Sequence, residues 1–163
     1  MNRLYARSVL LLLMLPLSAT AQDTDYRPSR IGEDCFRLGA AAAFSEMVRF
    51  DVKKLALTTA VSPQEMIVLE DELRRTIAEQ GVQAHLETDL IVTDLFPEDI
   101  AEGKHLILIY KGDTLDGYLA LKEKKQALVR NGKYSGQARK DIAREFGRML
   151  SYPEATIEEK IKQ

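Results

Sequence analysis

The sequence has few of the residues that build small, covalently stabilised scaffolds. Its 163 residues include one cysteine, no tryptophan, five prolines and nine glycines. One cysteine excludes an intramolecular disulfide and a multi-cysteine metal scaffold. The low proline and glycine content excludes a collagen-like chain and a Pro/Gly-rich linker array. With 45% hydrophobic and 29% charged residues, the composition is typical of one ordinary folded domain.

Familiar catalytic and nucleotide-binding motifs are also absent. The sequence contains no GxSxG, P-loop, GxGxxG or HExxH pattern, so it indicates no known nucleophile, phosphate cradle or zinc site. His85 and His105 fall in predicted strands and lack the spacing of metal ligands. They form a trio with Cys35 only if their strands pair with both histidines on one face. We therefore predict no metal and no cofactor.

The first 21 residues have the pattern of a secretory signal peptide. Arg3 and Arg7 precede an apolar stretch at residues 9–15. The small residues Ala19 and Ala21 stand just before Gln22, where a signal peptidase would cut. This stretch is shorter than the roughly 20 residues of a membrane-spanning helix. We predict a signal peptide over residues 1–21, cleavage before Gln22, and a periplasmic or secreted protein. A retained membrane anchor is the alternative, and we expect no membrane association.

Residues 22–32 are polar and contain proline, which predicts a flexible leader before a single domain over residues 33–163. Apolar residues at spacings of three and four predict a first helix over residues 33–58. Ser62, Pro63 and Glu65 form a capping box that starts a second helix, which ends at Gly81. The two helices are expected to form an antiparallel hairpin.

Beyond Gly81 the apolar residues recur at every second position, which indicates strands. We predict strands at residues 82–86 and 90–92, with a turn at 87–89, although Leu86, Leu90, Ile91 and Leu95 equally suit the apolar face of a helix. A buried strand is predicted at residues 105–110. The short connection over residues 97–103 favours antiparallel pairing.

Three helices are predicted after this strand, over residues 114–130, from Ser135 to about residue 150, and over residues 153–161. The predicted fold class is α+β: a helix-rich single domain with an N-terminal helical hairpin, a small, mostly antiparallel sheet of two to three strands, and three C-terminal helices.

Charge is distributed unevenly along the chain. Residues 22–103 carry a net charge of −9, whereas residues 104–163 carry +5. Lys140, Arg144 and Arg148 recur every four residues opposite the apolar face of their helix, and Lys124 and Lys125 add to the basic region. We interpret these five residues as a binding surface. The alternative is self-complementation, in which the acidic N-terminal helices lie alongside the basic ones as weak surface ion pairs.

Cys35 has three interpretations: a buried small hydrophobic residue, an interchain disulfide that joins a homodimer, or a catalytic thiolate. Asp94 follows a predicted strand, where side chains often face clefts, although it also suits a turn.

The sequence predicts an exported accessory or binding protein, with inhibition as one form of binding. It would act without catalysis through contacts with another exported protein or an anionic ligand. Export and the net acidity disfavour nucleic acid as a partner. The alternative function is a small periplasmic enzyme or ligand carrier with a site near Cys35, Asp94 and His105.

Overall fold

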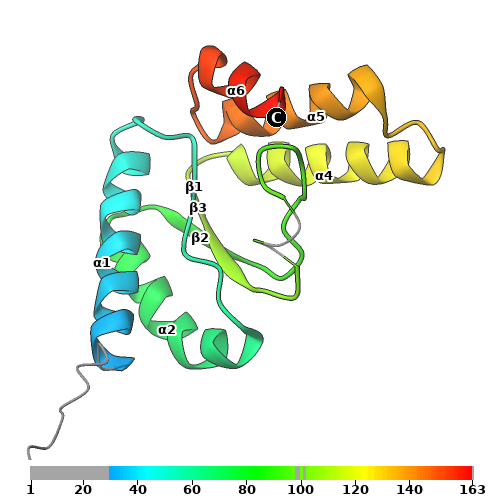
Figure 1. Ribbon diagram of the computed structural model, residues 1–163. Helices are drawn as coiled ribbons and strands as arrows, with labels where there is room; N and C mark the ends of the chain where they lie inside the picture. The colour runs from blue at the N-terminus through cyan, green and yellow to red at the C-terminus, as the bar shows by residue number, and fades with distance from the viewer. Residues whose placement is uncertain (1–29, 98–99, 101, 163) are drawn as a thin grey trace, which may run out of the picture.

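The computed structural model describes residues 30–97, 100 and 102–162 (Figure 1). Within these ranges it contains five helices and a three-stranded antiparallel sheet, which confirms the predicted helix-rich α+β fold. The predicted signal peptide, and the predicted leader as far as residue 29, lie outside the described residues.

The sheet has the strand order β1-β3-β2, so β3 (Leu106–Tyr110) is its central strand. β1 (Leu55–Leu57) and β2 (Gln83–Glu87) both pair with it in antiparallel register. All five residues of β3 are buried, because helices cover both faces of the sheet. Side chains alternate between these faces along each strand, so β3 contributes to two separate hydrophobic cores.

Two pairs of helices enclose the sheet (Figure 1). α1 (Arg30–Arg49) and α2 (Pro63–Glu79) pack against Ile107 and Ile109. α4 (Thr114–Arg130) and α5 (Gly136–Met149) pack against the opposite face. α6 (Glu154–Ile161) packs on α5. α1 and α2, which together carry a net charge of −3, and α4 to α6, which together carry +2, therefore lie on opposite sides of the sheet.

α2 begins with the predicted capping box. The Glu65 N–H donates to the Ser62 side chain at 3.3 Å, and the Ser62 N–H donates to the Glu65 carboxylate at 3.0 Å. Gly81 follows the last helical turn with φ 71°, a conformation that glycine adopts without steric cost. The predicted start and end of this helix are confirmed.

The first helix is shorter than predicted, and β1 was not predicted. α1 starts at Arg30 instead of residue 33 and ends at Arg49 instead of residue 58. Asp51 has φ 60° and turns the chain after the helix, so Leu55 can pair with Tyr110 of β3. α1 and α2 still pack together as predicted, with β1 in the connection between them. Three residues are too few to show whether the apolar pattern is that of a helix or of a strand.

The predicted strand at residues 90–92 and the turn at 87–89 are wrong. Glu87 is the last residue of β2, and residues 90–92 belong to no strand. Leu90 and Ile91 are buried in the core under α4, and the Ile91 N–H donates to the Tyr118 hydroxyl group at 3.2 Å. Burial against a helix thus produced an apolar pattern that resembles a strand.

The C-terminal helices agree with the prediction closely. α4 has the predicted bounds, α5 follows Ser135, and α6 follows Pro153. Among the residues that the structure describes, none of the helices combines the length and the apolar character needed to cross a bilayer.

Candidate functional site

An open hollow of about 940 Å³ lies on the side of the molecule that holds α5 and α6. Its walls come from residues 92–95, 97 and 100 of the connection after β2, from Lys125 of α4, from Tyr134, from the start of α5 and from the end of α6. Among the described residues, five basic side chains and one carboxylate, that of Asp94, line it; the basic residues are Lys125, Arg139, Lys140, Lys160 and Lys162. We call this site the basic hollow.

A short turn holds Asp94 at the wall of the basic hollow. Thr93 and Phe96 exchange two backbone hydrogen bonds, at 3.0 and 3.1 Å, and the buried Thr93 hydroxyl group accepts from the Leu95 N–H at 3.2 Å. The Asp94 carboxylate then accepts from the Arg139 Nε at 2.7 Å. This ion pair fastens the connection to α5 and neutralises Asp94, the one acidic residue in the described lining of the hollow.

Tyr134 lies beside this ion pair and is half-buried. Burial, and to a lesser degree the Asp94 carboxylate, raise the pKa of the Tyr134 phenol above its ordinary value. The phenol therefore stays protonated at neutral pH and can donate a hydrogen bond. The Lys125 ammonium group lies 5.2 Å from the centre of the Tyr134 ring, within the range of a cation–π contact.

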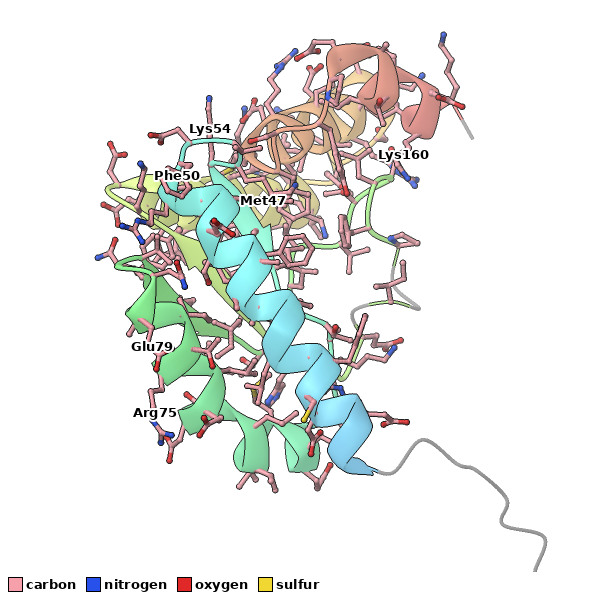
Figure 2. All side chains as sticks on the ribbon, turned by 90° about the vertical axis from the view of Figure 1, so that its left-hand side faces the viewer. Met47, Phe50, Lys54, Arg75, Glu79 and Lys160 are labelled. Carbon is pink, nitrogen blue, oxygen red and sulfur yellow. The ribbon has the colours of Figure 1, made fainter. Side chains whose placement is uncertain are left out.

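Three lysines give the basic hollow its excess positive charge. Lys140, Lys160 and Lys162 are exposed and make no ion pair within the described part of the chain. Figure 2 shows Lys160 at the α6 end of the molecule, well separated from Arg75 and Glu79 of α2. Gly136, the first residue of α5, also lines the hollow, and the positive end of the helix dipole adds to the potential there.

The two arginines of the predicted stripe have partners on α6. Arg144 holds Glu158 through two hydrogen bonds, at 2.5 and 2.9 Å, and Arg148 holds Glu154 through two, at 2.6 and 3.1 Å. These pairs lower the pKa of both carboxyl groups. The stripe is therefore divided, since Arg144 and Arg148 face α6 whereas Lys140 faces the basic hollow.

The other two predicted binding residues, Lys124 and Lys125, lie at different sites. Lys124 forms an ion pair with Glu145 of α5, whereas Lys125 lines the basic hollow. Lys124, Arg144 and Arg148 are thus paired within the protein, but the carboxylates that pair with them belong to α5 and α6. The acidic N-terminal helices lie across the sheet and do not provide them.

The alternative site residues are not gathered at one place. Asp94 lines the basic hollow, while Cys35 lies on α1, on the other side of the sheet. His105 pairs with Val61 just before β3. His85 lies opposite Leu108 in β2, so strand alternation directs the two histidines to opposite faces. No metal-binding group of three His, Cys, Asp or Glu residues occurs among the described residues.

Cys35 is exposed in the structure, so its interpretation as a buried hydrophobic residue is wrong. The interchain disulfide stays a prediction, which electrophoresis with and without reductant would test.

The charged and aromatic residues of the described lining that were not predicted from the sequence are Tyr134, Arg139, Lys160 and Lys162. One signal in the sequence could have predicted that α5 and α6 pack together, which brings Lys160 and Lys162 to the basic hollow. Glu154 and Glu158 are four residues apart, as are Arg144 and Arg148. Two antiparallel helices with this matched spacing can form both ion pairs at once.

Comparisons with protein-family models, with curated proteins and with solved structures find no match to this chain.

Proposed function

We propose that this protein is an exported binding module that acts without catalysis and holds an anionic group of its partner in the basic hollow. The observation that carries the proposal is the meeting of Lys140, Lys160 and Lys162, which have no ion-pair partner in the described part of the chain, around one opening. Like charges so arranged repel one another. An anion relieves this repulsion, which gives a physical reason for binding.

The remaining groups of the basic hollow favour binding over chemistry. Asp94 is held by Arg139, which makes it a poor general base. The raised pKa keeps the Tyr134 phenol protonated, so it serves as a hydrogen-bond donor to an anion. The volume of about 940 Å³ lies within the size range of sites for small ligands or for a few side chains of a partner.

Citrate is a suitable probe, because it carries several carboxylates and is small enough for the basic hollow. We expect saturable shifts of the Gly136 and Arg139 amide signals when isotope-labelled protein is titrated with citrate, and no shifts in α2. Lys160→Glu should weaken citrate binding about tenfold, because an attraction is replaced by a repulsion. Added salt should weaken it further.

Lys54→Glu is the matched control, because Lys54 is exposed and lies far from Lys160 (Figure 2). It changes the net charge by the same amount and should leave citrate binding nearly unchanged. Shifts that never saturate, or equal losses in the two variants, would overturn the proposal.

Export is tested separately by sequencing the N-terminus of the native protein. The signal-peptide pattern predicts a chain that begins at Gln22. Recovery of native protein that begins at Met1 would contradict the exported location.

A further inference from the structure

A second hollow, of about 320 Å³, adjoins the basic hollow. It lies between residues 89–92 and α4. The two hollows share Val92 and Lys125, so together they form one groove along the connection after β2. We call it the connection groove.

The connection groove has an apolar floor and basic sides. Val92 and Leu95 line its floor, and Val129 of α4, with 53% of its surface exposed, lines the wall of the second hollow. Arg130 extends the row of basic residues along α4, and it makes no ion pair within the described part of the chain.

The one acidic residue in the described lining of the second hollow is already engaged. Asp89 forms an ion pair with Lys122 at 3.3 Å, just as Asp94 is held by Arg139 in the first hollow. The described lining of the groove therefore carries a net positive charge along its length, and not at a single point.

We propose that the connection groove binds an extended segment of another exported protein in which acidic and apolar side chains alternate. This inference rests on the proposed function and names the partner chemistry of the same site. Acidic side chains complement the lysines and Arg130, and apolar side chains cover Val92 and Val129. Single-stranded nucleic acid fits less well, because binding without sequence preference relies on exposed aromatic rings for stacking, and Tyr134 is the one aromatic residue that lines the groove in the described part of the chain.

The test compares two labelled probes by fluorescence anisotropy at low salt: a peptide of alternating glutamate and leucine that spans both hollows, and a glutamate dipeptide. The long peptide should bind at least tenfold more tightly. Val129→Asp should weaken its binding about tenfold, or about 1.4 kcal/mol, and leave citrate binding unchanged. Val68→Asp is the matched control, because Val68 is 65% exposed on α2, across the sheet from the groove.

Each outcome decides between the two proposals. If citrate binds but the long peptide has no advantage over the dipeptide, or Val129→Asp has no effect, the extended groove is wrong and the basic hollow stands. If citrate does not bind, the proposed function itself fails. Tighter binding of a single-stranded oligonucleotide than of the peptide would overturn the partner class. If the circular-dichroism spectrum shows that Val129→Asp does not fold, Arg130→Glu is used in its place. Arg130 is exposed and lines the same hollow.

Discussion

The hydroxyl group of Tyr118 on α4 contacts both the end of β2 and the connection that follows it. It donates to the Glu87 carboxylate at 2.8 Å and accepts from the Ile91 N–H at 3.2 Å. Glu87 is 4% exposed and also accepts from Lys122 at 3.0 Å. This cluster fixes the end of β2 and the start of the connection groove against α4.

Tyr118→Phe should lower the free energy of unfolding by about 1–3 kcal/mol, because it leaves a buried carboxylate oxygen and a buried N–H with one partner fewer. Urea unfolding at neutral pH measures this loss. Tyr110→Phe is the control, since the Tyr110 hydroxyl group makes no hydrogen bond with other described residues. An equal loss in both variants would show that the Tyr118 hydrogen bonds contribute nothing beyond ring packing.

The same residue predicts a dependence on alkaline pH. Burial, followed by the hydrogen bond to Glu87, raises the pKa of Tyr118 well above its ordinary value of 10.0. Above pH 10.0 the unfolded chain releases this proton while the folded chain retains it, so deprotonation favours unfolding. The free energy of unfolding should therefore fall more steeply above that pH in the wild-type protein than in Tyr118→Phe. Parallel curves would contradict this assignment.

α5 and α6 approach each other closely at Gly147. A Cβ atom at this position would lie 2.7 Å from Leu95 Cδ1 and 2.8 Å from Ile157 Cγ1, well inside contact distance. Alanine usually stabilises a helix relative to glycine, but here the clash decides the sign. Gly147→Ala should destabilise the protein by about 1–3 kcal/mol, measured by thermal or urea unfolding.

Gly39 of α1 provides the opposite case. No atom lies within 4 Å of a Cβ built at this position, so Gly39→Ala should stabilise the protein by about 0.5–1 kcal/mol through helix propensity alone. A stabilising effect of Gly147→Ala would mean that α6 does not pack on α5 as the structure shows.

Elements whose ends are fixed by local chemistry were predictable from the sequence. α2 is an example, because Ser62 and Glu65 cap it within four residues. β1 was not predictable, since three residues carry no periodic pattern and their strand form depends on pairing with β3, about fifty residues away. For the same reason the charge pattern identified Lys125 and Lys140 but not Lys160 and Lys162, which reach the basic hollow only once α6 packs on α5.

The acidic part of the chain does not lie wholly across the sheet from the basic helices. α1 and α2 together carry a net charge of −3, whereas residues 87–103 carry −6, and Glu87, Asp89 and Asp94 of that segment pair with Lys122 and Arg139 of α4 and α5. The described lining of the basic hollow still forms a positive face, although the formal net charge of the chain is −2. Such a face attracts an anionic partner over distances of about a Debye length, roughly 10 Å in 0.1 M salt.

Ion exchange tests the positive face of the basic hollow directly. We expect the protein to be retained on a sulfonate cation-exchange matrix at neutral pH and low salt, because the basic hollow can face the matrix. Lys160→Glu should remove most of this retention, whereas Lys54→Glu, with the same change in net charge, should reduce it only slightly. Equal losses in the two variants would show that retention follows net charge alone, and the local charge of the basic hollow would then have no role in it.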